Sequence, residues 1–282
     1  MHLLKHAERS NRFAASCREL QASGLCSPIM TKIEKAVVLA AGRGTRMREL
    51  TAEVPKPMID VRGKPVLQHI IEGLRDAGVR ELLIVVGYRA DAVRKFFADG
   101  SRQKIAIQYA TQTVQDGTGR VVDLARGFVG DSPFVLSYGD ILIDPANYKR
   151  VVDLPNNIEA IITVTRGEDV SKGGAVFLND DMELVDIREK ISGATLQVAI
   201  QEKGQVKNML HQLWYNAGIY AFRPSIFEFT AKLKPSPRRE YELTDAIRDL
   251  AQSGKKVQAL ELTGEWADVR DPEILARLNS QL

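Results

Sequence analysis

The sequence predicts an α/β protein, Rossmann-like, with a mostly parallel sheet and helices on both faces. Short apolar runs rich in β-branched residues alternate with helical patterns at the spacing of βαβ units. The apolar share of 44% and the charged share of 27% over 282 residues are typical of a globular chain. The second half has several short strand-like runs separated by Gly and Asn-Asp turns, which predicts a smaller, mixed, β-rich part.

The first half supplies the alternating pattern. The run at 35–39 is short, apolar and followed by glycine, as expected of a buried parallel strand. Pro65 suits the first turn of a helix, and Gly78 suits its end. The other predicted elements here are strands at 82–86, 105–109 and 134–136 and helices at 91–97 and 118–128.

The second half departs from this regular alternation. We expect strands at 160–165, 175–178, 183–187, 195–200, 214–222 and 257–262, and helices at 225–233, 243–253 and 271–278. Residues 1–32 lack the apolar core of a signal peptide, and we expect them to form a flexible extension before a domain at 33–282.

Composition excludes some classes of partner. The net charge of +3 is spread along the chain and does not favour nucleic acid, and no apolar run is long enough for a membrane span. Cys17 and Cys26 are the only cysteines; we expect reduced thiols in a cytoplasmic protein, and the alternative is a structural disulfide between them. A homo-oligomer is compatible with the sequence.

The stretch after the first strand is a candidate phosphate-binding loop. Gly42 and Gly44 allow backbone N–H groups to turn toward a phosphate. A dinucleotide fingerprint would need glycine where Met47 stands, and the Gly-Lys-Ser/Thr of a P-loop is absent. Arg46 and Lys56 flank the loop and could hold a triphosphate; the alternative is a glycine-rich turn with solvated charges.

Three motifs carry a resemblance to the sugar nucleotidyltransferase family: LAAGRGTRM at 39–47, PKPM at 55–58 and GKP at 63–65. Members of this family join a sugar 1-phosphate to a nucleoside triphosphate and release pyrophosphate, a reaction of the EC 2.7.7 type. The resemblance implies a nucleotide-binding part at about 33–150 and a sugar-binding part at about 151–282. It also implies that Arg46 and Lys56 are catalytic.

The resemblance extends to the nucleotide site. The segments YATQ at 109–112 and DGT at 116–118 resemble the family's base-reading segment. A glutamine amide has a donor and an acceptor, as a pyrimidine edge requires, so Gln112 favours a pyrimidine triphosphate. Gly119 and Arg120 stand where many members have small apolar residues, which leaves the base open. The implied nucleotide-binding residues are Ala40, Ala41, Gly42, Gly44, Thr45, Gln112, Gly117 and Thr118.

Two aspartates are expected to hold Mg²⁺. Asp140 follows a predicted parallel strand, at the sheet edge where α/β proteins bind ligands. Asp268, in WADV at 266–269, resembles the family's second metal ligand. Mg²⁺ prefers oxygen ligands and commonly uses one or two carboxylates together with phosphates. The fold must bring these distant residues together.

The sugar 1-phosphate would bind the second half. Glu189 and Lys190 resemble the family's Glu-Lys pair, in which the carboxylate accepts bonds from sugar hydroxyls and the lysine holds the phosphate. Ile191 follows where a proline is usual. Gly174 and Asn216 also match sugar-contact positions.

Two other readings stay open beside a pyrimidine nucleotidyltransferase acting on a hexose 1-phosphate. One is a non-catalytic subunit of the same fold that binds sugar nucleotides, and the other is a mannose-1-phosphate guanylyltransferase. A nicotinamide-dependent dehydrogenase is disfavoured by Met47.

Overall fold

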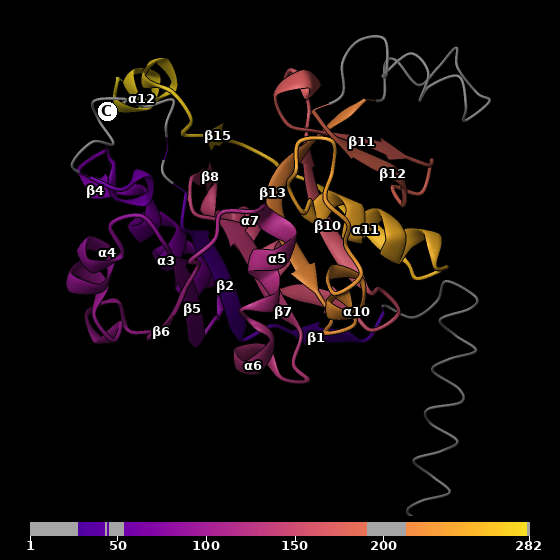
Figure 1. The fold of residues 1–282 in the computed structure, drawn as a ribbon, viewed down its shortest axis with the longest axis horizontal. Helices are drawn as coiled ribbons and strands as arrows, with labels where there is room; N and C mark the ends of the chain where they lie inside the picture. Colours follow the sequence, from indigo (N-terminus) through magenta and orange to yellow (C-terminus); the bar gives the residue numbers. More distant parts are fainter. Residues whose placement is uncertain (1–27, 43, 45–53, 191–212, 281–282) are drawn as a thin grey trace, which may run out of the picture.

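The centre of the molecule is a nine-stranded sheet (Figure 1). The structure is a computed structural model, and it describes residues 28–42, 44, 54–190 and 213–280. Seven of the strands follow the order β12-β11-β13-β7-β2-β5-β6, while β10 pairs with β13 and β14 pairs with β10. The sheet therefore runs without interruption through both halves of the chain.

The first half contributes four parallel strands. They are β2 (Lys35–Ala40), β5 (Glu81–Val86), β6 (Ala106–Thr111) and β7 (Phe134–Tyr138). Because they are parallel, their carboxyl ends meet at one edge, and described residues that follow β2, β6 and β7 line one cavity there.

The second half adds strands that are mostly antiparallel. They are β10 (Ala160–Thr165), β11 (Gly174–Leu178), β12 (Leu184–Glu189), β13 (Trp214–Phe222) and β14 (Val257–Glu261), of which β10 and β14 pair in parallel.

Strand β13 connects the two halves. Strand β10 occupies one of its edges from Tyr215 to Phe222. Its other edge is shared, because β11 pairs with Trp214 and Tyr215 whereas β7 pairs with Ile219 to Phe222. Within the described residues, neither strand pairs with positions 216–218 on that edge. The sheet forks there, above the end of β7.

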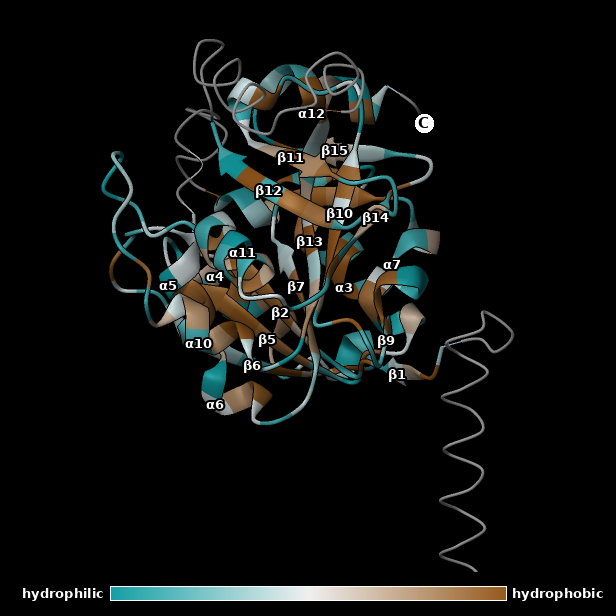
Figure 2. Cartoon of the chain, turned by 90° about the vertical axis from the view of Figure 1, so that its right-hand side faces the viewer, coloured by the Kyte–Doolittle hydropathy of each residue, from teal (hydrophilic) through white to brown (hydrophobic). Residues whose placement is uncertain are grey.

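Helices cover both faces of the sheet. The alternation of side chains along β2 directs Ala36 and Val38 into one core and Val37 into the other. Figure 2 shows the apolar strands between helices whose outer surfaces are hydrophilic. The first core is packed by α3 (Val66–Ala77), α4 (Ala90–Phe97), α7 (Pro145–Val151) and α12 (Pro272–Asn279), and the second by α5 (Thr118–Asp123), α6 (Arg126–Val129), α10 (Ile226–Thr230) and α11 (Leu243–Gln252).

Short elements complete the fold. Strand β1 (Met30–Lys32) pairs with β9 (Asp153–Pro155). The last three residues of the extension expected at 1–32 therefore form a strand. The others are β3 (Asp60–Val61), β4 (Lys64–Pro65), β8 (Ile141–Ile143), β15 (Trp266–Asp268) and the 3-10 turns η2 (Lys56–Met58), η3 (Ser101–Gln103) and η4 (Val170–Lys172).

The predicted fold class is confirmed, with differences in detail. The helix expected at 118–128 is interrupted between α5 and α6, where the N–H groups of Leu124 and Ala125 bond to Val121 and Val122, three residues back. The strand expected at 195–200 lies outside the described residues. Among the described helices, none combines the length and apolar character needed to cross a bilayer.

Candidate active site

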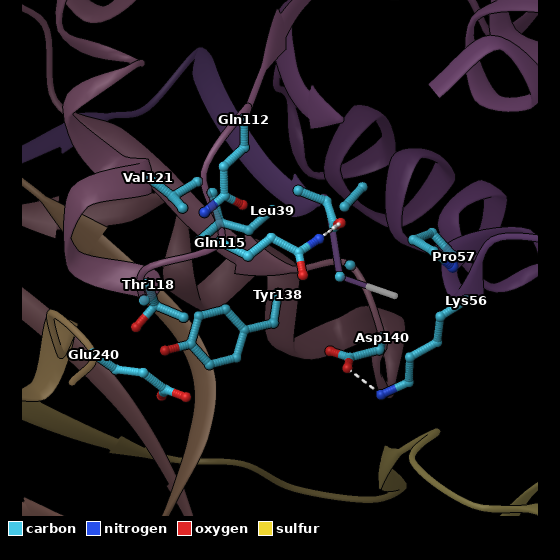
Figure 3. A pocket seen from close by; sticks show the side chains of 15 residues that line it. Leu39, Lys56, Pro57, Gln112, Gln115, Thr118, Val121, Tyr138, Asp140 and Glu240 are labelled. Carbon is cyan, nitrogen blue, oxygen red and sulfur yellow. Dashed lines mark hydrogen bonds and ion pairs between the residues drawn. The ribbon is translucent and has the colours of Figure 1, made fainter. Parts of the chain in front are cut away.

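Two cavities meet at the carboxyl edge of the parallel strands. The first has a volume of about 360 Å³ and the second about 180 Å³. Lys56, Tyr138 and Asp140 line both, so the cavities are neighbours that share one wall. In Figure 3, Tyr138 lies between Thr118 on one side and Asp140 and Lys56 on the other.

The first cavity is formed by the loops after β2, β6 and β7. The Gln115 amide donates a 3.0 Å hydrogen bond from Nε2 to the Ala41 carbonyl, and this ties the loop after β6 to the glycine loop (Figure 3). The Gln112 N–H continues the ladder of β6 by donating to Val86, at 2.8 Å. The lining residues are Leu39, Ala40, Ala41, Gly42, Lys56, Pro57, Gln112, Gln115, Gly117, Thr118, Val121, Tyr138, Gly139, Asp140 and Glu240.

Lys56 lies where the two cavities join. Pro57 is buried in the η2 turn, which the Met58 N–H closes with a 2.8 Å bond to the Pro55 carbonyl. The Lys56 ammonium forms a short ion pair with Asp140 and lies 3.7 Å from Oδ1 of Asp268. Its side chain is 13% exposed, so water screens these attractions only partly.

The sheet register explains why two distant aspartates are adjacent. Strand β15 pairs antiparallel with β8, which places Asp268 opposite Ile141. The next residue, Val269, donates a 2.9 Å hydrogen bond from its N–H to the Asp140 carbonyl. The two carboxylates therefore face the same ammonium group, as the convergence expected from the sequence requires.

The donor chemistry of this pair fits Mg²⁺. Two carboxylates supply hard oxygen ligands, and magnesium commonly takes one or two of these and completes its shell with phosphates and water. No group of three or more His, Cys, Asp or Glu residues suited to a metal occurs in the described part of the chain. A metal at Asp140 and Asp268 would thus need oxygen atoms from a substrate or solvent.

The second cavity lies at the fork in the sheet. Gly174 is opposite Glu189 in the β11–β12 ladder, and the Lys190 N–H donates to the Gly173 carbonyl at 2.6 Å. Gly218 adopts a φ of +82°, and a Cβ there would lie 2.8 Å from the Tyr138 ring. The lining residues are Lys56, Tyr138, Asp140, Ile141, Lys172, Gly173, Gly174, Glu189, Lys190, Tyr215, Asn216, Gly218, Trp266, Asp268 and Arg270.

Hydrogen bonds connect the floors of the two cavities. Asn216 donates from Nδ2 to the Tyr220 hydroxyl at 2.7 Å, and that hydroxyl lies 3.4 Å from the Tyr138 hydroxyl. Thr118 bonds to Tyr138 in turn. Burial raises the pKa of Tyr138 well above its ordinary value, so this hydroxyl stays protonated at neutral pH.

Glu189 has a buried carboxyl group whose pKa is strongly raised. Burial, reinforced by the charge of Glu242, raises its pKa from 4.5 to about 7, although Lys190 and Arg238 act in the opposite direction. Between pH 4.5 and 7 the folded protein therefore binds a proton that the unfolded chain has lost. Stability falls as the pH rises through that window, and the full cost is present above pH 7.

Most of the residues expected in the site line one of the two cavities. Those from the first half are Ala40, Ala41, Gly42, Lys56, Gln112, Gly117, Thr118 and Asp140, and those from the second are Gly174, Glu189, Lys190, Asn216 and Asp268. Gly44 is described but lines neither cavity. Thr45 and Arg46 lie outside the described residues.

Several lining residues were not anticipated from the sequence. Arg270 is 11% exposed and lies 3.5 Å from Asp268, 3.3 Å from the Tyr215 hydroxyl and 3.3 Å from Glu168. Its position two residues beyond Asp268 was an available signal, because a cation so near a predicted metal ligand in the sequence is expected near the same site. Tyr138 is likewise two residues from Asp140. Gln115, Glu240 and Lys172 had no comparable signal.

Comparisons with known proteins place the chain in a family. The sequence profile of a family described as nucleotidyl transferase matches residues 35–282. The UTP–glucose-1-phosphate uridylyltransferase AglF of Haloferax volcanii is 32% identical over 243 residues, which cover 85% of this chain and 92% of that protein. The bifunctional protein GlmU of Methanococcus maripaludis is 32% identical over 238 residues, or 84% of this chain and 51% of GlmU. The chain thus spans about half the length of the GlmU relatives it matches.

A solved structure supports the fold. A UDP-glucose pyrophosphorylase complexed with UDP-glucose superimposes with a TM-score of 0.73 at 23% identity, covering 88% of this chain and 98% of that one. The likeness therefore concerns the fold of most of the chain.

Proposed function

Because the chain belongs to the nucleotidyl transferase family, and within it to the sugar nucleotidyltransferases, we propose that it joins a sugar 1-phosphate to a nucleoside triphosphate. The products are a nucleoside diphosphate sugar and pyrophosphate. One observation carries the proposal: the two cavities share Lys56, Tyr138 and Asp140. A nucleotide in the first cavity and a sugar phosphate in the second would meet at these residues.

The reaction is an in-line displacement at the α-phosphorus. An oxygen of the sugar phosphate forms the new P–O bond, and the bond from the α-phosphorus to the oxygen of the β-phosphate breaks. The electron pair of that bond leaves with pyrophosphate. A phosphate monoester has a second pKa of about 6, so the nucleophile is already largely a dianion at neutral pH. The chain therefore needs no general base, and alignment and positive charge remain its main tasks.

Lys56 is the proposed catalytic residue among those described. Its ammonium is fixed between the two cavities, where it can offset charge that builds up on the triphosphate. Arg46 is proposed to act with it on the triphosphate. Lys190 is proposed to hold the attacking phosphate, and Glu189 and Asn216 to bind sugar hydroxyls.

Asp140 and Asp268 are proposed to hold Mg²⁺. Two carboxylates beside a polyanionic substrate would repel it, so their presence at the junction is useful only with a cation between them and the phosphates. Bound Mg²⁺ would supply positive charge that neutralises the crowded phosphates. The Lys56 ammonium lies within ion-pair distance of the same two carboxylates, so it would compete with bound Mg²⁺ for them.

The base and the sugar are the finer part of the proposal. Gln112 lines the first cavity and has the donor and acceptor that a pyrimidine edge needs. We therefore favour a pyrimidine triphosphate and a hexose 1-phosphate, and AglF, a uridylyltransferase by name, supports this choice. A mannose-1-phosphate guanylyltransferase is the alternative within the same reaction class.

A matrix of the common nucleoside triphosphates against a panel of sugar 1-phosphates, with and without Mg²⁺, tests the proposal. We expect pyrophosphate release that requires both substrates and the metal, with the highest turnover for a pyrimidine triphosphate. Release with GTP and mannose 1-phosphate alone would select the guanylyltransferase. Binding of a sugar nucleotide with no turnover for any pair would instead identify a non-catalytic subunit.

A further inference from the structure

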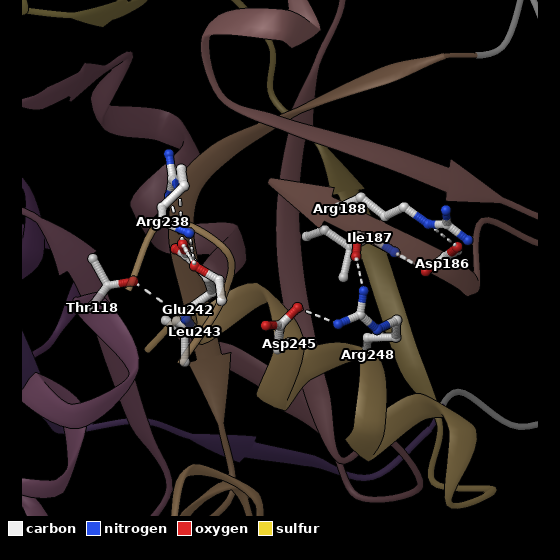
Figure 4. A network of polar contacts seen from close by, with 10 residues as sticks. Thr118, Asp186, Ile187, Arg188, Arg238, Glu242, Leu243, Asp245 and Arg248 are labelled. Atoms are coloured by element: carbon white, nitrogen blue, oxygen red, sulfur yellow. Dashed lines mark hydrogen bonds and ion pairs between the residues drawn. The ribbon is translucent and has the colours of Figure 1, made fainter. Parts of the chain in front are cut away.

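The segment at 236–243, which precedes and begins α11, lines the first cavity through Glu240, and the charges of its Arg238 and Glu242 act on Glu189, which lines the second cavity. We name this segment the bridging segment. In Figure 4, Leu243 lies beside Thr118 of the nucleotide part, Arg238 lies against Glu242, and α11 continues toward β12 of the sugar part. Its contacts suggest a role that neither cavity reveals alone.

The bridging segment is fastened to the base-reading loop by backbone hydrogen bonds. Tyr241 donates from its N–H to the Asp116 carbonyl and accepts a bond from the Gly119 N–H, both at 2.7 Å. The Leu243 N–H lies 3.3 Å from the Thr118 hydroxyl. Gly117 has a φ of +116°, and a Cβ there would lie 2.4 Å from the Tyr241 carbonyl oxygen. Such close approach of two backbones requires glycine.

One side-chain pair strengthens this attachment. The Arg120 guanidinium lies 3.8 Å from the centroid of the Tyr241 ring, a cation–π contact. The same guanidinium donates a 3.0 Å bond from Nη1 to the Asp116 carboxylate. Arg120 therefore holds the loop and the segment together, which gives a structural reason for a cation at this position. Neither Arg120 nor Tyr241 lines either cavity.

Side-chain contacts within the bridging segment fix its shape. Arg238 donates to Glu242 at 2.6 Å and to Glu240 at 3.1 Å, and the Ser236 hydroxyl lies 3.1 Å from Glu242. The Glu242 side chain is 8% exposed, and its charge contributes to the raised pKa of Glu189. Glu240 lines the nucleotide cavity.

Helix α11 continues the connection to β12. Arg248 forms a short ion pair with Asp245 and lies 3.4 Å from the Ile187 carbonyl, two residues before Glu189 (Figure 4). The helix also packs its buried face on the core that contains Ile187. A shift of the start of α11 would therefore change the position of the Glu189 carboxylate relative to the base-reading loop.

We propose that Arg120 and Tyr241 are positioning residues that set the separation between the base-reading loop and the Glu189–Lys190 end of β12. The proposal rests on the proposed function, because it concerns how one bound substrate is aligned with the other. Its consequence is that loosening the Arg120–Tyr241 contact weakens the binding of the sugar 1-phosphate, which neither residue touches.

Substitution of the pair tests this proposal through the two Michaelis constants. Arg120→Ala should raise the KM for the sugar 1-phosphate by roughly five- to tenfold, together with the KM for the triphosphate, a size expected for losing a cation–π contact with an ion pair. Tyr241→Ala should behave alike, and the double variant should be no worse than either single one. Tyr241→Phe keeps the ring and should match the wild type, and Arg120→Lys should recover part of the loss.

Arg94 provides a matched control. Its guanidinium lies 4.8 Å from the centroid of the Tyr109 ring and donates a 2.9 Å bond to the Thr111 hydroxyl, next to Gln112. It makes the same kinds of contact beside the base-reading loop but has no contact with the bridging segment in the described structure. Arg94→Ala should leave the KM for the sugar 1-phosphate unchanged.

The outcomes are distinct. The Arg120 side chain is 55% exposed, so Arg120→Ala should fold. A change in this variant that is confined to the KM of the triphosphate would overturn the positioning role. If the wild type releases no pyrophosphate, calorimetric titration with glucose 1-phosphate replaces the KM. Weaker binding in Arg120→Ala than in Arg94→Ala then supports the positioning role although the proposed reaction has failed. Equal binding in both variants, or no binding to the wild type, overturns the positioning role.

Discussion

Replacing Lys56 by alanine is the most direct test of the junction between the cavities. The change removes the only ammonium that lies within 4 Å of both Asp140 and Asp268 in the described structure. At an effective dielectric of about 20, one charge pair at 4 Å is worth about 4 kcal/mol before desolvation is subtracted. Loss of one preorganised transition-state donor lowers turnover by about 10²–10³-fold. We therefore expect kcat to fall by at least ~100-fold, or about 2.7 kcal/mol.

The assay is steady-state pyrophosphate release at saturating concentrations of both substrates and Mg²⁺. Lys56→Arg keeps the charge and should retain more activity than Lys56→Ala. Lys64→Ala is the control for loss of a lysine, because Lys64 pairs with Glu72 at the surface, at 2.9 Å, away from both cavities. Turnover of Lys56→Ala within a few-fold of the wild type would refute the reasoning.

A second readout separates the charge of Lys56 from its effect on the metal site. The ammonium and Mg²⁺ would be attracted by the same two carboxylates, so removing the ammonium should not weaken metal binding. Titration of the unliganded protein with Mn²⁺, followed by electron paramagnetic resonance, should give an affinity equal to or higher than that of the wild type. A large loss of Mn²⁺ affinity would mean that Lys56 shapes the carboxylate pair rather than competing for it.

Three further predictions follow from the site. Glu189→Gln should raise the free energy of unfolding at pH 8 by up to about 3 kcal/mol and have little effect at pH 4.5, because folding raises the pKa of the Glu189 carboxyl from 4.5 to about 7. Urea unfolding in which the variant and the wild type differ by the same free energy at both pH values would contradict this. Asp268→Asn should raise the Mg²⁺ requirement at least ~10-fold and weaken Mn²⁺ binding; unchanged binding would remove it from the metal site. Gly117→Ala should cost about 1–3 kcal/mol because of its positive φ and the clash with Tyr241, whereas Gly127→Ala, in α6 with nothing within 4 Å, should leave thermal unfolding unchanged or slightly raise its midpoint.

The sequence was most informative where local chemistry decides the structure. The apolar run of β2 and the glycine at Gly42 predicted a strand followed by a loop at the ligand-binding edge, and the structure has both. Asp140 and Asp268 could be paired only through the resemblance, because nothing local fixes the β8–β15 register that makes them neighbours.

The remainder depends on long-range contacts that a single sequence does not encode locally. Tyr138 lies between the two cavities because the sheet forks beside it, where β7 and β11 pair with different parts of β13. The interruption between α5 and α6 escaped prediction because residues 118–128 keep a helical apolar pattern throughout. The bridging segment gave no signal either, since the closeness of Gly117 to Tyr241 is set by how two distant parts of the chain dock.

The shared strand β13 restricts the motions that can accompany a reaction cycle. It is hydrogen-bonded to β7 of the nucleotide part and to β10 and β11 of the sugar part. A hinge rotation of one half against the other would have to break these ladders, at a cost spread over many bonds. Any closing movement should therefore come from loops at the rim of the cavities. The distance between the two cavities should stay constant, because one extended strand fixes it.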